Sequence, residues 1–137
     1  MRQMTIATIL VGAALVAAPA FAHHAFSAEF DSKKPVKLTG TITKIEWINP
    51  HSWIHIDVKG ADGTVTNWMV EGGSPNALLR RGIAKEMLKE GMQIAVDGYM
   101  AKDGTNRANG RDITLADGKK LFVGSSGTDA PDERPEK

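Results

Sequence analysis

The sequence contains no cysteine, which excludes disulfides, a cysteine nucleophile and a lipid-modified cysteine. Aromatic residues make up only 6% of it, and neither sign of charge is in excess, with 17 basic and 16 acidic residues. No segment gathers lysine and arginine between aromatic residues, the pattern typical of a nucleic-acid-binding surface. We therefore expect a protein that folds without covalent cross-links and does not bind nucleic acid.

The common catalytic motifs are also missing. The sequence has no Gly-x-Ser-x-Gly elbow, no phosphate-binding glycine loop and no His-Glu-x-x-His helix. Five carboxylates could pair in space, but the sequence gives no reason to choose two of them for acid–base chemistry: Glu29, Asp31, Glu46, Asp57 and Glu71. We expect a binding protein rather than an enzyme.

The first 22 residues have the layout of a secretory signal peptide. Arg2 supplies the positive charge, residues 6–18 are apolar, and Ala20-Phe21-Ala22 is a small-residue cleavage site. A membrane anchor would need roughly 20 apolar residues, whereas Pro19 and the histidines after Ala22 end this run earlier. We expect cleavage after Ala22, a periplasmic location and no membrane insertion of the mature chain.

The mature chain of about 115 residues is long enough for one domain with a single core. Residues 23–35 form an N-terminal segment, and residues 36–123 form the domain. Residues 124–137 contain no large apolar side chain, which predicts a disordered tail.

The domain is predicted to be mainly β. Residues 52–58 alternate cleanly, with Ile54, Ile56 and Val58 on one face and polar or aromatic residues on the other. Ser74-Pro75 predicts a helix start, and Leu79, Ile83 and Met87 recur at helical spacing, although Gly82 ends or kinks that helix. The expected strands, in chain order, are 36–48, 52–58, 64–71, a fourth that follows a turn within 88–99, and 111–123, the last interrupted at Asp117-Gly118.

The expected order is three strands, a helix and two further strands, and the long first strand is bent near Gly40. This order predicts a small five-stranded OB-like barrel with one helix between strands three and four. A small sandwich or a half-open roll fits the same order and is the alternative.

Three motifs resemble an exported bacterial single-domain family of unknown function. They are the mature start His23-His24-Ala25-Phe26-Ser27-Ala28-Glu29-Phe30-Asp31, the turn Glu46-Trp47-Ile48-Asn49-Pro50-His51-Ser52-Trp53, and the helix start Gly73-Ser74-Pro75-Asn76 with Arg80-Arg81-Gly82 after it. The resemblance implies a periplasmic single domain and brings no activity, cofactor or catalytic residue.

The four histidines form two close pairs, His23-His24 and His51/His55. Cleavage after Ala22 would give His23 a free α-amino group beside its own imidazole, and these two nitrogens can chelate one metal ion. His24 or a histidine of the barrel could add a third nitrogen. Such a nitrogen-rich set favours Cu(II). A frayed terminus without a metal is the alternative.

His51 and His55 are predicted to lie on or beside a strand, where four residues span about 13 Å. One ion therefore joins both only if the turn at Asn49-Pro50 folds back. His51, in the loop, has more freedom to reach the N-terminus than His55.

A second function needs no metal. By the alternation Trp53 faces away from the core, and Trp47 or Trp68 could join it to bind a glycan, a peptide or a partner protein, or could close the core instead.

Ser74, Arg80 and Arg81 suggest an anion near the helix, although basic residues there more commonly complement the helix C-terminus. We expect a periplasmic binding module, with Cu(II) or a similar ion at the mature N-terminus, or with the tryptophan face as the alternative.

Overall fold

The computed structural model describes residues 26–124. The predicted signal peptide, His23 and His24, and the predicted tail beyond Gly124 lie outside the described residues. In chain order the elements are α1 (Phe26–Glu29), β1 (Phe30–Glu46), β2 (Trp53–Lys59), β3 (Val65–Glu71), α2 (Pro75–Arg80), the 3-10 helix η1 (Lys85–Met87), β4 (Gln93–Ala101), β5 (Arg107–Leu115) and β6 (Lys120–Phe122). Within this part of the chain, no helix is long and apolar enough to cross a membrane.

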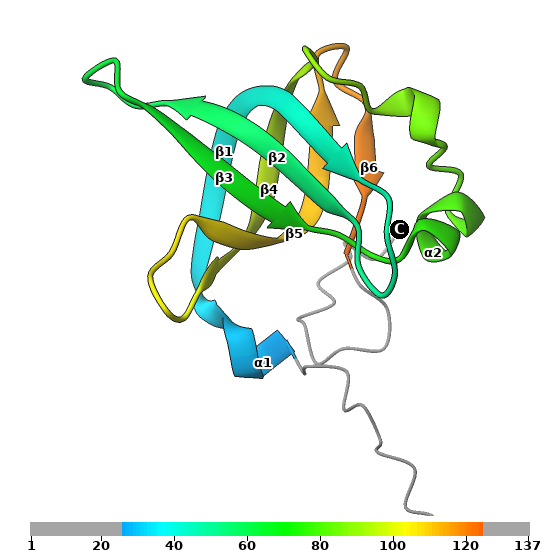
Figure 1. The fold of residues 1–137 in the computed structure, drawn as a ribbon, viewed down its shortest axis with the longest axis horizontal. Coiled ribbons are helices and arrows are strands. Elements are labelled where there is room, and N and C mark those ends of the chain that lie inside the picture. The colour runs from blue at the N-terminus through cyan, green and yellow to red at the C-terminus, as the bar shows by residue number, and fades with distance from the viewer. Residues whose placement is uncertain (1–25, 125–137) are drawn as a thin grey trace, which may run out of the picture.

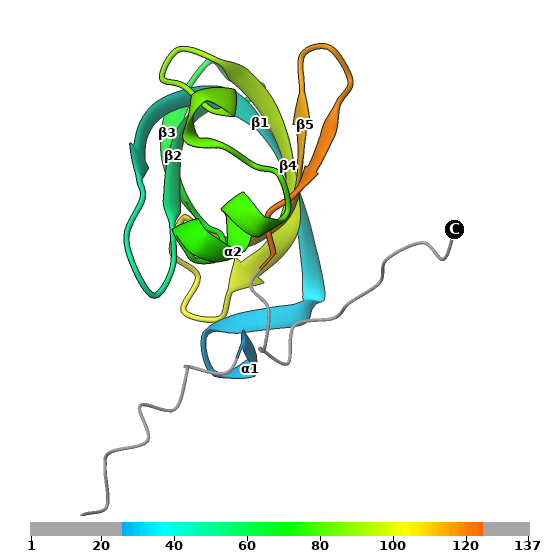
Figure 2. The same ribbon diagram turned by 90° about the vertical axis from the view of Figure 1, so that its right-hand side faces the viewer.

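The strands form one sheet that closes on itself (Figures 1 and 2). The order is β3-β2-β1-β4-β5-β6, and a further pairing between β3 and β5 completes a ring of five strands. All neighbours are antiparallel except β3 and β5, which run parallel with Met69 opposite Arg107 and Glu71 opposite Asn109. The prediction of a mainly β domain is confirmed.

The long strand β1 makes the closure possible because it pairs on both sides. Its first part pairs with β4 from Phe30 to Thr41, and its second part pairs with β2 from Gly40 to Glu46. Gly40 lies where the two pairings overlap, and a Cβ atom there would come within 2.5 Å of the Asp57 carbonyl oxygen. Glycine therefore lets β1 arch across the ring, as the cyan strand of Figure 1 shows.

The described chain has six strands rather than the five expected. The segment predicted as strand 111–123 turns back at Asp117-Gly118, so that β5 and β6 form a hairpin. Two strands also begin earlier than predicted. Phe30 already pairs with Ala101 ahead of Lys33, Lys34 and Pro35, and β5 begins at Arg107 inside the expected polar loop. Polar side chains on the outer face made both starts resemble loops.

The core fills the inside of the ring. Ile54 and Ile56 of β2 are 1% and 0% exposed, while Trp53, His55 and Asp57 are half-buried on the opposite face. The predicted alternation of β2 is therefore confirmed. The remaining fully buried side chains of the ring include Ile42, Val70, Ile94, Val96, Ala108 and Ile113.

The helix α2 lies across one end of the ring (Figure 2) and buries Leu78 in the core. Its predicted start is confirmed, because the Ser74 hydroxyl accepts a hydrogen bond from the Ala77 N–H at 3.2 Å. Gly82, with φ of +82°, ends the helix as predicted. Of the apolar residues at helical spacing, Leu79 is 62% exposed, whereas Ile83, beyond the helix, is 4% exposed.

The two faces of β2 should respond differently to substitution. Ile56→Asp would place a carboxylate in the core and should abolish cooperative folding. His55→Ala removes one outer-face hydrogen bond and should lower the free energy of unfolding by no more than about 1 kcal/mol. Circular dichroism and urea unfolding of both variants measure this, and a greater loss from His55→Ala would refute the assigned faces.

Candidate functional site

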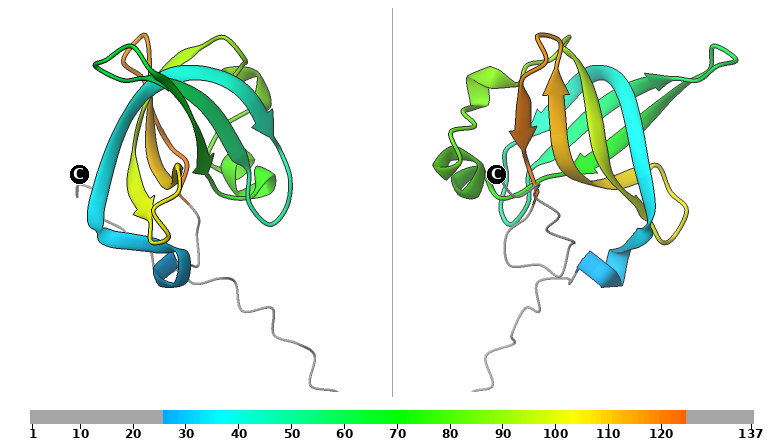
Figure 3. Two further views of the ribbon diagram at one scale, coloured as in Figure 1. Left: turned by 60° about the vertical axis from the view of Figure 1, so that its left-hand side comes forward. Right: turned by 180° about the vertical axis from the view of Figure 1, so that it is seen from behind.

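The short helix α1 is docked firmly on the closed sheet, below the start of β1 (Figure 3). Phe26 and Phe30 are 4% and 2% exposed, and the Phe26 ring stands edge-on to Tyr99 of β4 at a centroid distance of 5.3 Å. The Lys102 N–H, after β4, donates to the Glu29 carbonyl oxygen at 2.8 Å. These contacts hold both ends of α1 at this end of the sheet.

Three strand ends bring polar side chains together beside α1. Trp53 pairs with Glu71, and Glu71 pairs with Asn109, so the three side chains are neighbours on one face. The alternate residues Ile54, Val70 and Ala108 point into the core. The outer face of β2, β3 and β5 therefore carries a cluster that we call the Glu71 site: Glu29, His51, Trp53, Glu71, Arg107 and Asn109.

Arg107 connects this face to α1. Its guanidinium lies 5.4 Å from the centre of the Trp53 ring and 5.8 Å from that of Phe30, both within cation–π range. Its Nη2 is 3.4 Å from Oε2 of Glu29. One cation thus joins the last residue of α1 to the first residue of β2.

Glu71 is the most perturbed acid of the site. Its side chain is only 8% exposed, and burial raises the pKa of its carboxyl group to about 7, with the negative charge of Glu29 adding to the effect. Arg107 and a hydrogen bond with Asn109 act in the opposite direction and do not restore the ordinary pKa. Near neutral pH this carboxyl group therefore exists in both protonation states.

The two described histidines contact different carboxylates. Nδ1 of His51 lies 3.7 Å from Oε1 of Glu71, whereas Nε2 of His55 lies 2.7 Å from Oε2 of Glu46. Lys44 and His55 hydrogen-bond to Glu46 and lower the pKa of its carboxyl group. His51 therefore belongs to the Glu71 site, and His55 belongs to a separate pair.

The three tryptophans do not share a face. Trp53 lies on the outer face under Arg107, while Trp47 and Trp68 are partly buried and pack against the core. His23 and His24 lie outside the described residues, and among residues 26–124 no three histidine or acidic side chains are grouped closely enough to hold a metal ion.

The sequence indicated this site only in part. It named His51 and Trp53, and it listed Glu29 and Glu71 among five carboxylates without choosing them. Arg107 and Asn109 were overlooked because they fall in a segment that was expected to be a loop. The alternation of polar Arg107 and Asn109 around the small Ala108 is the signal that could have identified them as one face of a strand.

Glu71 should make the fold less stable as the pH rises. Because its pKa is about 7 in the folded state and about 4.5 when exposed, the folded protein binds the extra proton, and stability falls between these two pH values. Glu71→Gln removes the ionisation and should stabilise the protein at pH 8 by about 3 kcal/mol, with little gain at pH 4. Urea unfolding at both pH values measures this.

Glu90→Gln, in the exposed turn before β4, is the matched control and should change neither value. Equal stability of wild type and Glu71→Gln at pH 8 would show that the Glu71 carboxyl group is not destabilised by burial.

Comparison with known families gives one match, over residues 11–110, to the model of a family of unknown function, DUF6152. No curated protein matches the chain. The family has no assigned activity, and nothing in the match indicates an enzymatic one. Because the match spans well over half of the sequence, including β1 to β4 and the start of β5, the chain belongs to DUF6152, a family of unknown function.

Proposed function

We propose that this protein is an exported, non-enzymatic binding module with an OB-like fold, and that the Glu71 site is its binding face. The β1-β2-β3 meander, the helix between β3 and β4 and the parallel β3–β5 pairing support the OB-like assignment. In OB folds, ligands bind on the face of strands two and three and on the loops after strands one and four. The Glu71 site occupies the same face here.

The sharper proposal is that this face completes a Cu(II) site begun by the mature N-terminus. The observation that carries it is the docking of α1, since Phe26 is 4% exposed and only Ala25 separates it from His24 in the sequence. Glu29, at the other end of this four-residue helix, contacts Arg107 of the Glu71 site. Because α1 is only about 6 Å long, its docking would keep a terminus that begins at His23 within reach of this site.

The nitrogen donors that these histidines would offer suit copper. After cleavage, His23 would offer its α-amino nitrogen and its imidazole, and His24 and His51 could add further nitrogens. His51 is the appropriate partner because its Nδ1 faces Glu71. A carboxylate that hydrogen-bonds to one ring nitrogen orients the imidazole for ligation through the other nitrogen, and Glu71, now 3.7 Å from Nδ1, would move closer to take this role. The α-amino group must lose its proton to bind, so affinity should fall in acid.

The copper proposal distinguishes between the two described histidines. With the native terminus, His51→Ala should change the Cu(II) paramagnetic resonance spectrum and lower affinity about 10-fold or more. His55→Ala should leave both unchanged, because His55 is paired with Glu46. A chain beginning Gly-Ser-His23 should lose the native spectrum, since its His23 has no free amino group.

The reference for these measurements is an unstructured peptide beginning His-His-Ala-Phe. If the protein binds Cu(II) no more tightly than this peptide, and His51→Ala leaves the spectrum unchanged, the copper site does not exist. A metal-independent module that binds a glycan, a peptide or a partner protein through Trp53 then becomes the leading account. The stacking of Arg107 on the outward-facing Trp53 favours this second function.

Export can be tested separately. Ala20-Phe21-Ala22 is a small-residue site at the end of the apolar run. Intact-mass measurement of the periplasmic fraction should find a chain beginning at His23. A membrane-bound chain that retains residues 1–22 would contradict both the location and the free amino group that the copper proposal needs.

A further inference from the structure

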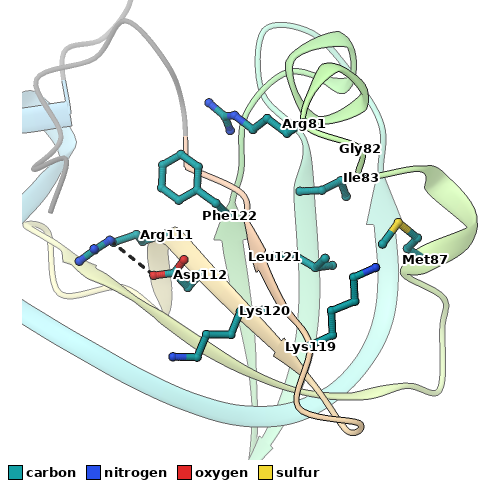
Figure 4. A pocket seen from close by; sticks show the side chains of 10 residues that line it. All are labelled: Arg81, Gly82, Ile83, Met87, Arg111, Asp112, Lys119, Lys120, Leu121 and Phe122. Carbon is teal, nitrogen blue, oxygen red and sulfur yellow. Dashed lines mark ion pairs between the residues drawn. The ribbon is translucent and has the colours of Figure 1, made fainter. Parts of the chain in front are cut away.

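A second concave region of the surface shares no residue with the Glu71 site. It lies between the β5–β6 hairpin and the connection from α2 to η1, and it encloses about 510 Å³. Figure 4 shows Arg81, Arg111, Lys119 and Lys120 arranged around Leu121 and Phe122. We call this region the basic pocket.

The basic pocket has an excess of positive charge in a protein that is otherwise nearly neutral. It is lined by four cations and a single carboxylate, that of Asp112. Asp112 is already paired, because its Oδ2 lies 3.5 Å from Nε of Arg111. Among the described residues, no carboxylate forms an ion pair with Lys119 or Lys120. The net charge of the lining therefore favours an anion.

Two parts of the basic pocket are held in place by the fold. The Arg81 guanidinium lies 4.7 Å from the centre of the Phe122 ring and donates a hydrogen bond from Nη1 to the Gly124 carbonyl oxygen. Lys119 and Lys120 follow a turn in which the Asp117 carboxylate accepts from the Lys119 N–H at 2.9 Å. A ligand would therefore meet a guanidinium and a ring that the fold holds in place, while the exposed Lys119 and Lys120 side chains, which point to opposite sides in Figure 4, would turn toward it on their flexible stems.

We propose that the basic pocket binds the phosphate group of a phosphate ester, with Phe122 and Met87 contacting its organic part. A phosphate monoester carries close to two negative charges at neutral pH and accepts several charge-assisted hydrogen bonds. It therefore matches a group of cations better than a single carboxylate would. Phe122 and Met87 supply apolar surface in the lining, which the organic part of an ester can contact and inorganic phosphate cannot.

The test is a titration of the full chain with phenyl phosphate at low ionic strength, followed by amide chemical shifts. The shifts should concentrate at Arg81, Lys119, Lys120 and Phe122. Inorganic phosphate should bind at the same residues but about fivefold more weakly, because it lacks a ring to contact Phe122. Shifts spread over all exposed lysines, or equal affinity for the two probes, would overturn the proposal.

Charge-neutral variants provide a matched comparison. Lys119→Gln with Lys120→Gln removes two charges from exposed positions of the basic pocket, and Lys33→Gln with Lys34→Gln removes two from exposed positions of β1. The first pair should weaken phenyl phosphate binding about fivefold, as expected for two solvent-exposed ionic contacts. The second should change binding less than twofold. Equal weakening by both would show general charge attraction and no site.

The source of the phosphate group can be identified with vesicles of phosphatidylglycerol. If the phosphate belongs to a lipid headgroup, the protein should sediment with the vesicles, and the Lys119 and Lys120 substitutions should release it while the control pair does not. If the protein binds phenyl phosphate and does not sediment, the ligand is a soluble ester. Sedimentation that both pairs reduce equally would overturn a site for lipid phosphate.

Discussion

The architecture depends on the way β1 crosses between its two neighbours. At Gly40 this strand faces Val58 of β2 on one side and Ile94 of β4 on the other. The absence of a side chain there allows the Asp57 carbonyl to approach closely. Because β1 can pair on both sides, the sheet curls until β3 meets β5. That last contact is parallel, and it places Glu71 opposite Asn109 and Met69 opposite Arg107.

The Glu71 site follows from this closure. Glu71 ends β3, and it would be an ordinary solvated acid if β3 were the edge of an open sheet. In the closed sheet, Asn109, Arg107 and Glu29 surround it, and its pKa rises because burial and Glu29 outweigh Arg107. A buried acid that lowers the stability of the fold is the type of feature found where a protein retains a group for binding. The aromatic contacts of α1 keep Glu29 beside it.

The Glu71 site and the basic pocket differ in the charges that line them. The Glu71 site combines two carboxylates, an arginine and a half-buried tryptophan around strand ends. The basic pocket has four cations along a hairpin and a helix end, with its one carboxylate paired to Arg111. A single small domain thus carries a half-buried site of mixed charge and, apart from it, a region with an excess of positive charge.

The sequence by itself determined the features that depend on neighbouring residues. Alternation in β2 identified Ile54 and Ile56 as core, Ser74-Pro75 located the start of α2, and Asp117-Gly118 marked the turn that divides the last strand. These features are local, because strand period, helix capping and turn conformation act over a few residues. The mainly β class followed from the same local patterns.

Only the tertiary structure decided which carboxylates meet and whether Trp47 and Trp68 join Trp53 on the outer face or pack against the core. Glu29, Glu71 and Arg107 are separated by more than 30 residues in the chain, and the parallel pairing of β3 with β5 that brings two of them together leaves no local pattern. Alternation in β2 already placed Trp53 outward, but the sequence left Trp47 and Trp68 open, and the structure packs both against the core. Contacts of this kind form because the sheet closes, and closure is a property of all the strands together.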